Sequence, residues 1–300
     1  MVQRAQPREG LPTFLVIGAM KAGTTSLYHY LAAHPDVYMA SVKELDFFVE
    51  AANWDRGTDW YRKQFDDARG ATAIGEASTA YTKYPVVPGV PERIAGVIPD
   101  CRLIYVLRDP IDRIRSHYQH RVAIGTERAP LEEAVIEDPV YLACSRYAAQ
   151  IERYLERFPR EQLLLITSEH LRSDRAETMR RVFRFVGVDE GIVPTTMDQE
   201  YYRTEGRARF PPIVGKLRHT LKEHVPAAKR AKELVDSTLP RLMPSHRAAA
   251  KDASSADTSI PSATRVRLTQ LLQADVDRLA RYLPGDMDGW SVVPCDRSLR

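Results

Sequence analysis

The chain has 300 residues, a formal net charge of +3, 44% hydrophobic residues and 28% charged residues. This length and composition are typical of a soluble globular protein that buries a complete hydrophobic core. The small net charge does not favour a nucleic-acid partner, and no apolar run is long enough to span a membrane.

The cysteines Cys101, Cys144 and Cys295 are odd in number and widely spaced. Such spacing gives neither a disulfide framework nor a metal site and is typical of a reducing compartment. Residues 1–12 are polar and unlike a secretory signal, so we expect a flexible N-terminus. The sequence therefore predicts a cytoplasmic protein without a metal. It leaves peripheral membrane contact open and does not indicate an oligomeric state.

The first predicted unit is a strand, a loop and a helix within Phe14 to Leu31. Residues 14–17 are apolar and predict a buried strand, Gly18 and Gly23 bracket a tight loop, and the helical pattern begins at Thr24. Unpaired amides at a helix N-terminus attract anions. The unit therefore predicts a phosphate-binding loop, and its candidate binding residues are Lys21, Ala22, Gly23, Thr24, Thr25 and Ser26.

This loop nearly matches the nucleotide P-loop pattern G-x-x-x-x-G-K-[ST]. Gly18, Gly23 and Thr25 fit, but Thr24 stands where the pattern has lysine, and Lys21 lies inside the loop. The displaced lysine indicates a ligand without a γ-phosphate. The alternative is a glycine turn without a ligand.

A short strand is predicted at 37–39, and a charged pair, Lys43 and Glu44, then precedes Phe47 and Phe48. The functional interpretation is a carboxylate held at the wall of a cleft by buried rings, and the alternative is a surface turn. A further strand is expected at 73–78. Glu76 lies near its end, where ligands bind in open α/β sheets, although a carboxylate that braces a loop is equally compatible.

Residues 102–107 predict another buried strand, followed by Arg108 and by a helix with Pro110 at its first position. Arginine binds phosphate in a bidentate manner, so Arg108 and Ser116 form a candidate second anion site. A salt bridge from Arg108 and a solvent-facing Ser116 are the alternatives.

Short helices are expected within 54–65 and at 91–98. A helix at 147–158, a strand at 162–167 and a helix at 176–186 complete an alternating pattern. Alternation of this kind predicts an α/β three-layer sandwich with a central parallel sheet.

We expect one domain over 13–300, with 211–300 as a mainly helical extension. Its basic helices at 213–250 are either a solvated face or a contact for an acidic or membrane surface. Residues 251–262 are expected to be mobile, and a last helix at 264–282 to be packed back by Trp290.

Two anion sites on one sheet resemble those of sulfotransferases that use 3′-phosphoadenosine 5′-phosphosulfate (PAPS), in particular the heparan-type carbohydrate branch and its bacterial relatives. The first loop resembles their 5′-phosphosulfate loop, and Arg108 to Ser116 resembles their 3′-phosphate motif. Further likenesses are residues 43–48, 75–81 and 205–208. The departures are Ala77 and Glu205, each in place of a lysine.

The resemblance implies transfer of a sulfuryl group from PAPS to a hydroxyl or amine of a glycan, glycolipid or small-molecule acceptor, with release of 3′-phosphoadenosine 5′-phosphate (PAP). Lys21 and Glu44 are then catalytic, the latter as the base. The implied cofactor residues include Arg108, Ser116, Gly206 and Arg207, with Arg113 bracing the loop, and the implied acceptor residues are Lys43, Glu76 and Tyr81.

Other functions remain compatible with the sequence. A P-loop kinase would need lysine at Thr24 and an acid at the strand end, where Asp109 is adjacent to Arg108. A nucleotide-binding module without turnover is the third interpretation. The alternative bases are the histidines His29, His34, His117 and His120.

Overall fold

The computed structural model describes residues 10–68, 70–192 and 259–295. Its core is a parallel five-stranded sheet with the order β2-β3-β1-β4-β5. The strands are β1 (Phe14–Gly18), β2 (Val37–Met39), β3 (Ala73–Ala77), β4 (Arg102–Leu107) and β5 (Leu163–Thr167). The predicted α/β class with a central parallel sheet is therefore confirmed.

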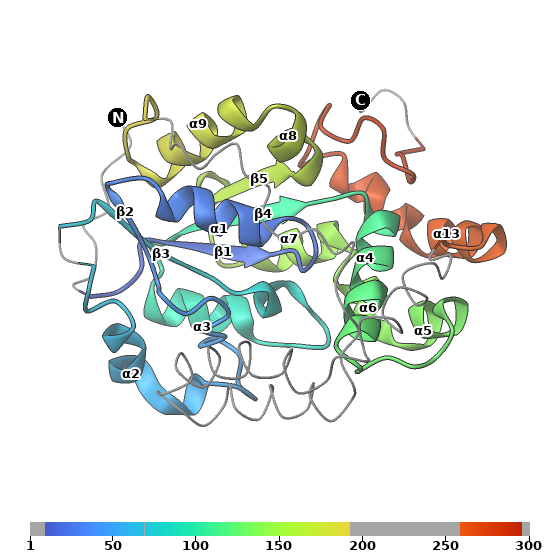
Figure 1. Cartoon of the computed structure of the whole chain (residues 1–300), viewed down its shortest axis with the longest axis horizontal. Helices are drawn as coiled ribbons and strands as arrows, with labels where there is room; N and C mark the ends of the chain where they lie inside the picture. The colour runs from blue at the N-terminus through green and yellow to red at the C-terminus, as the bar shows by residue number, and fades with distance from the viewer. Residues whose placement is uncertain (1–9, 69, 193–258, 296–300) are drawn as a thin grey trace, which may run out of the picture.

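Helices cover both faces of the sheet. The α-helices are α1 (Thr24–Ala32), α2 (Gly57–Lys63), α3 (Val90–Val97), α4 (Pro110–Ala123), α5 (Leu131–Glu137), α6 (Pro139–Ala143), α7 (Tyr147–Leu155), α8 (Ser168–Ser173), α9 (Arg175–Val186) and α13 (Ser262–Leu279). Short 3-10 helices are η1 (Trp54–Arg56), η2 (Thr79–Thr82) and η3 (Arg160–Gln162). Figure 1 shows α1, α8 and α9 on one side of the sheet and α2 and α3 on the other.

The strand sequences explain this arrangement. All five residues of β1 are buried, as are all those of β4 except Arg102, which is usual for strands of a parallel sheet covered on both faces. Gly75 of β3 lies against the ring of Phe14, and a Cβ atom there would lie 2.2 Å from that ring. Glycine at this position thus lets β3 approach β1.

The connections after β1 and β4 run in opposite directions across the sheet. The chain leaves β1 through α1 toward the edge strand β2, and it leaves β4 toward the other edge strand β5. Ligands of open α/β sheets bind at such a reversal, beyond the carboxyl ends of the strands. The topology therefore favours a site formed by the loops after β1 and β4.

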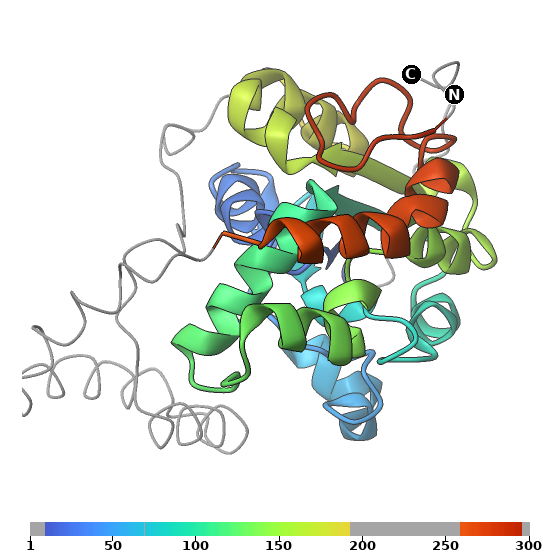
Figure 2. The ribbon, with the colours of Figure 1, turned by 90° about the vertical axis from the view of Figure 1, so that its right-hand side faces the viewer.

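The C-terminal segment, residues 259–295, packs against the sheet domain. Helix α13 lies on α7 and α4 (Figure 2), and its Asp275 accepts hydrogen bonds from the backbone N–H groups of Ala148 and Ala149 at 2.9 and 3.0 Å. Trp290 is 4% exposed, which confirms the prediction that it packs back on the domain. Within the described ranges, no helix is both long and apolar enough to cross a membrane.

Three short helices, α5, α6 and α8, were not predicted. The family-like segment at 205–208, the predicted basic helices at 213–250 and residues 251–258 lie outside the described residues.

Candidate active site

The loop between β1 and α1 is shaped by its two glycines. Gly18 has a φ of 152°, and a Cβ atom there would lie 2.0 Å from Oγ1 of Thr82. Gly23 is the N-cap of α1 and has a φ of 100°. Lys21 adopts a φ of 70°, a left-handed conformation that is uncommon for a residue with a side chain. Glycine is needed at position 18 because Thr82 of η2 packs directly against it.

The N-terminus of α1 has the properties of an anion site. Neither a side-chain cap nor an acidic residue occupies its first turn. Thr24 is 4% exposed, while Thr25 and Ser26 are half-buried. The backbone N–H groups of this turn and the positive end of the helix dipole therefore favour a negative group, and the residues present fit a phosphate.

Two arginines connect this loop to the loop after β4. Nη1 of Arg108 donates to the backbone carbonyl of Lys21 at 3.3 Å. Nη1 of Arg113 donates to the carbonyl of Met20 at 3.4 Å. The structure thus brings together the two predicted anion-binding segments, and Arg113 braces the first loop as predicted.

The sequence left a salt bridge from Arg108 to Asp109 or a neighbouring carboxylate as an alternative, and Arg108 does form one, with Asp112 rather than Asp109. Its Nη2 lies 3.9 Å from a carboxylate oxygen of Asp112, one turn into α4, and its side chain is 20% exposed. The Asp109 carboxylate instead accepts from the N–H of Asp112 at 2.8 Å and caps α4. Ser116 on the same helix is 6% exposed, so it is not the solvent-facing serine that its sequence context alone favoured.

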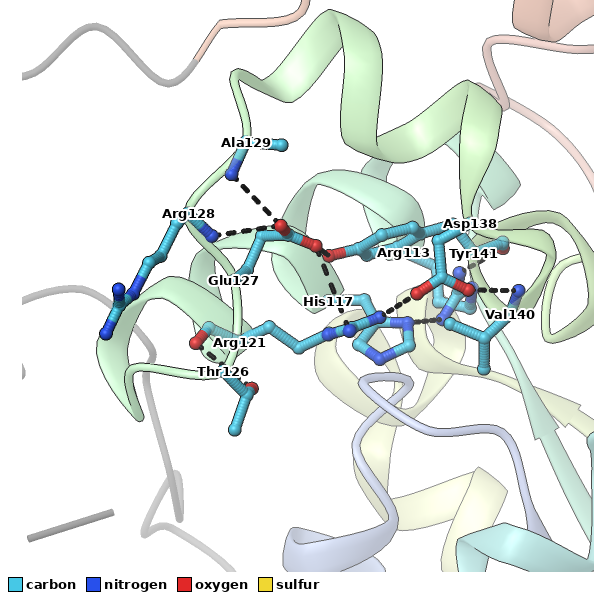
Figure 3. Close-up of polar contacts among 10 residues, drawn as sticks. All are labelled: Arg113, His117, Arg121, Thr126, Glu127, Arg128, Ala129, Asp138, Val140 and Tyr141. Carbon is cyan, nitrogen blue, oxygen red and sulfur yellow. Dashed lines mark hydrogen bonds and ion pairs between the residues drawn. The ribbon is translucent and has the colours of Figure 1, made fainter. Parts of the chain in front are cut away.

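Arg113 belongs to a buried network beside this region (Figure 3). Its guanidinium donates to Oγ of Ser145 at 2.5 Å and to the carbonyl of Tyr141 at 2.6 Å, and it lies 3.3 Å from Nδ1 of His117. Burial, with the Arg113 charge, lowers the pKa of His117 to about 2. This histidine is therefore neutral at physiological pH and a poor candidate for the base.

The same close-up shows how the end of α4 is held. Arg121 pairs with Asp138 at 2.5 Å and lies over the ring of Tyr141, whose hydroxyl donates to Glu127 at 3.0 Å. The network fixes α4, and with it Ser116 and Arg113, against α5 and α6.

Glu44 lies beside the carboxyl end of β3. Its N–H donates to the carbonyl of Ala77 at 2.9 Å, and Ala77 is paired with Val16 of β1. Oε2 of Glu44 accepts from the N–H of Thr79 at 2.7 Å and from its hydroxyl at 3.1 Å, while Oε1 pairs with Lys43. With 28% of its side chain exposed, Glu44 is both oriented and accessible.

The two phenylalanines after Glu44 anchor its loop. Phe47 and Phe48 are completely buried. Phe47 stacks on Tyr61 with ring centroids 4.1 Å apart, and the N–H of Phe48 donates to the hydroxyl of Tyr81 at 3.5 Å. The rings therefore hold the segment that carries Glu44, as predicted.

Glu76 lies inside the protein. It is 0% exposed, and burial raises its pKa to about 8. The hydroxyls of Tyr81 and Ser78 oppose this rise, and the nearby carboxylates Asp46 and Glu44 add to it. Glu76 is therefore mostly protonated at neutral pH, and its contact with an acceptor stays a prediction.

The other predicted residues include two in the late segment and two histidines. Gly206 and Arg207 lie outside the described residues. His34 is buried, and its Nε2 lies 2.9 Å from the carbonyl of Asp189, so it has a structural role rather than that of a base. His29 is half-buried, and burial together with Lys43 lowers its pKa.

Thr79 is a site residue that the sequence did not predict. A threonine three positions after Glu76 gave no sign that it would donate hydrogen bonds to Glu44.

No group of three or more potential metal-ligating side chains occurs in the described part of the chain. The groups that this region offers to a ligand are the guanidinium of Arg108, the amides at the start of α1 and the carboxylate of Glu44.

Residues 11–204 match the family model described as "Sulfotransferase domain". This chain belongs to the sulfotransferase family and is a transferase. The match agrees with the family resemblance of the two loops and decides against the kinase interpretation.

The alignments with the curated relatives cover more than half of this chain but less than a quarter of each relative. The human bifunctional heparan sulfate N-deacetylase/N-sulfotransferase 3 is 36% identical over 199 residues, which are 59% of this chain and 22% of that protein. The mouse N-deacetylase/N-sulfotransferase 4 is 33% identical over 207 residues, 62% of this chain and 23% of that protein. The chain thus spans about a fifth of the length of these relatives.

Among solved structures, a sulfotransferase from Alicyclobacillus acidocaldarius superimposes with a TM-score of 0.64 and 27% identity. The alignment covers 90% of this chain and 94% of that chain. The similarity extends over nearly the whole of both proteins and supports the same fold.

Proposed function

We propose that this sulfotransferase transfers a sulfuryl group from PAPS to a hydroxyl or amino group of a carbohydrate acceptor and releases PAP. The observation that carries the proposal is the junction of the two loops, in which Arg108 donates to the carbonyl of Lys21. A donor with a 5′-phosphosulfate and a 3′-phosphate needs an anion site on each loop.

The first loop binds the 5′ side of the donor. The N–H groups at the start of α1, with the hydroxyls of Thr24, Thr25 and Ser26, hold the 5′-phosphate. Lys21 and the neighbouring Ala22 and Gly23 complete this loop. When bound, PAPS supplies an activated sulfuryl group on a phosphate leaving group, and Lys21 stabilises the negative charge that develops between them.

The second loop binds the 3′-phosphate. Arg108 contributes a bidentate cation and Ser116 a hydroxyl from α4. Gly206 and Arg207 are proposed to contact the donor from the later segment, on the basis of the family resemblance alone.

Glu44 accepts the proton of the acceptor. Thr79 fixes one carboxylate oxygen through two hydrogen bonds, and the 28% exposure of the side chain leaves it accessible to a substrate. Positioning and charge stabilisation are the main contributions that a protein makes to a transfer of this kind, and one positioned base contributes about 10²- to 10⁴-fold.

Two observations bear on the acceptor. The human relative is named for N-sulfotransferase activity on heparan sulfate, which supports a carbohydrate acceptor. Ala77 replaces the lysine of the family's acceptor segment, so the site has one cation fewer for an acidic glycan. We therefore propose a neutral or amino sugar, with Lys43 as an acceptor-side residue. Tyr81 is 2% exposed, so we propose that it supports the acceptor side from within, through its contact with Phe48.

The donor is tested by calorimetric titration with PAP, adenosine 5′-phosphate and ATP on the wild type and Arg108→Ala. We expect PAP to bind at least tenfold more tightly than adenosine 5′-phosphate, because a bidentate charged contact is worth about 1.5–3 kcal/mol. Arg108→Ala should remove most of that difference. Equal affinity for PAP and adenosine 5′-phosphate in the wild type would contradict the proposal.

The acceptor is tested by transfer of radiolabelled sulfuryl from PAPS to oligosaccharides. The set should include neutral sugars, sugars with a free amino group and uronic-acid-containing sugars. We expect the neutral or amino sugars to be sulfated faster. A preference for the acidic sugars would contradict the proposed acceptor class but not the donor.

We also propose a reducing, cytoplasmic location. Cys101 and Cys144 are buried free thiols and Cys295 is an exposed one, which supports a compartment where thiols stay reduced.

A further inference from the structure

The loop that carries Arg108 is held by elements far along the chain. The backbone carbonyl of Arg108 accepts a hydrogen bond from the hydroxyl of Tyr147 at 2.8 Å. The N–H of Asp109 donates to Oε1 of Glu169 at 3.1 Å. Both backbone groups next to the proposed phosphate-binding side chain are therefore fixed, one from α7 and one from α8.

The carboxylate of Asp109 makes a third and longer connection. It is 5% exposed, and one oxygen caps α4 through the N–H of Asp112. Its other oxygen accepts from the backbone N–H of Ser291, which lies 182 positions further along the chain. A single buried carboxylate thus joins the start of α4 to the C-terminal segment.

The position of Ser291 is itself well determined. Its neighbours Trp290 and Val292 are 4% and 1% exposed, and the ring of Trp290 lies 6.1 Å from that of Tyr147. Helix α13 precedes this loop, and its Asp275 caps the first turn of α7, the helix that begins with Tyr147. Figure 2 shows the loop after α13 lying beside α8, where Asp286 is 3.5 Å from His170.

We propose that the C-terminal segment completes the 3′-phosphate site, with Ser291 and Asp109 as positioning residues that hold Arg108 in its binding geometry. This inference rests on the proposed function of Arg108. The segment lies beyond residues 11–204, which match the family domain. It supplies no charge to the phosphate and acts through the backbone of the loop.

The physical basis is preorganisation. Arginine has a long and flexible side chain, and ordering its loop during binding would reduce the affinity. Fixing the backbone on both sides of Arg108 in advance removes part of that loss. Loosening the C-terminal contact should therefore weaken recognition of the 3′-phosphate and leave the 5′ side of the ligand unaffected.

Ser291→Pro tests the contact directly, because it removes the N–H that donates to Asp109. We expect PAP affinity to fall about tenfold, the scale of one hydrogen bond to a charged group. Adenosine 5′-phosphate, which lacks the 3′-phosphate, should bind within about twofold of its wild-type affinity. A purely structural role would lower both affinities together or change only the thermal stability.

Asp109→Asn is the second variant, since proline at 291 could also prevent folding. Asparagine caps helices as well as aspartate does, but its amide offers one acceptor oxygen for the two N–H groups that Asp109 serves. Coulomb's law alone predicts tighter phosphate binding after loss of a nearby negative charge. We expect weaker PAP binding instead, and unchanged or tighter binding would overturn the proposal.

Arg265→Ala, in helix α13, is the matched control that contacts the same loop. It removes a guanidinium that donates to the Ser291 hydroxyl at 3.4 Å and leaves the Ser291 N–H in place. PAP affinity should stay within twofold of the wild type. If wild-type protein does not distinguish PAP from adenosine 5′-phosphate, the proposed function fails. If it does, and Ser291→Pro folds and distinguishes them equally well, only this inference fails.

Discussion

Two glutamates at the end of strand β3 have opposite environments. Glu44 is attached to the strand through Ala77, has 28% of its side chain exposed, and contacts Lys43 and Thr79. Glu76 lies within the strand and is 0% exposed, and burial and neighbouring carboxylates raise its pKa.

The comparison shows how environment separates the roles of chemically equal groups. A proton acceptor must be reachable and oriented, as Glu44 is with 28% of its side chain exposed and two hydrogen bonds from Thr79. A buried carboxyl without a cation keeps its proton, as the raised pKa of Glu76 indicates. The contrast supports the proposal that Glu44 is the base, whereas Glu76 lies in the interior.

The largest expected effect is on Glu44. Glu44→Gln keeps the shape of the side chain but cannot accept a proton, so we expect kcat to fall by about 10²- to 10⁴-fold. The measurement is radiolabelled transfer to the best oligosaccharide acceptor, with PAP titration as the control for donor binding. PAP affinity should stay within twofold. Normal turnover in this variant would place the base elsewhere, with His29 as the next candidate.

Glu76 should instead control the pH dependence of stability. Its pKa is about 8 in the folded protein and about 4.3 in an unfolded chain. At a pH between these two pKa values, Glu76 keeps its proton in the folded state and has lost it in the unfolded state. The free energy of unfolding therefore decreases as pH rises, by up to about 1.4 kcal/mol per pH unit.

Urea unfolding of wild type and Glu76→Gln at pH 5, 6, 7 and 8 measures this contribution. Glutamine is neutral at every pH, so the variant should lose less stability across the series and exceed the wild type at pH 8. Glu50→Gln is the control, since the Glu50 side chain is 74% exposed. Parallel profiles for wild type and Glu76→Gln would show that Glu76 is not the titrating group.

The sequence predicted the parts of the fold and site that local signals encode. Apolar runs predicted β1 and β4, and the helix starts at Thr24 and Pro110 were predicted to the residue. Gly18 and Gly23 predicted the tight loop, because glycine readily adopts the positive φ values found there. Gly18 also leaves room for Thr82. These features depend on a few consecutive residues.

The missing parts depend on contacts between distant residues. Nothing near Glu44 indicated that Thr79, 35 positions later, would orient its carboxylate. Asp109 and Ser291 are 182 positions apart, and each looks like an ordinary loop residue in the sequence. The burial of Glu76 follows from the rings and strands that surround it, which no local pattern specifies.

Thr79 supplies the next smaller effect. Thr79→Val keeps the β-branched shape and the N–H donor but removes the hydroxyl that lies 3.1 Å from Oε2 of Glu44. With one of two hydrogen bonds left, we expect kcat to fall about three- to tenfold. Thr79→Ser retains the hydroxyl and should keep most of the activity. Equal losses in both variants would mean that the methyl group, not the hydrogen bond, orients Glu44.

Lys43 should have the smallest effect if its role is limited to Glu44. The pair is partly exposed, with 21% of the lysine and 28% of the glutamate side chain accessible, and ion pairs of this kind contribute about 0–1 kcal/mol. Lys43→Met should therefore reduce kcat by no more than about fivefold. Lys43→Arg, which keeps the charge, should recover the loss. A reduction well above tenfold, accompanied by a higher KM for the acceptor and unchanged PAP binding, would show that the acceptor-side role proposed above for Lys43 outweighs its support of Glu44. In that case, the cation beside Glu44 serves the substrate as well as the base.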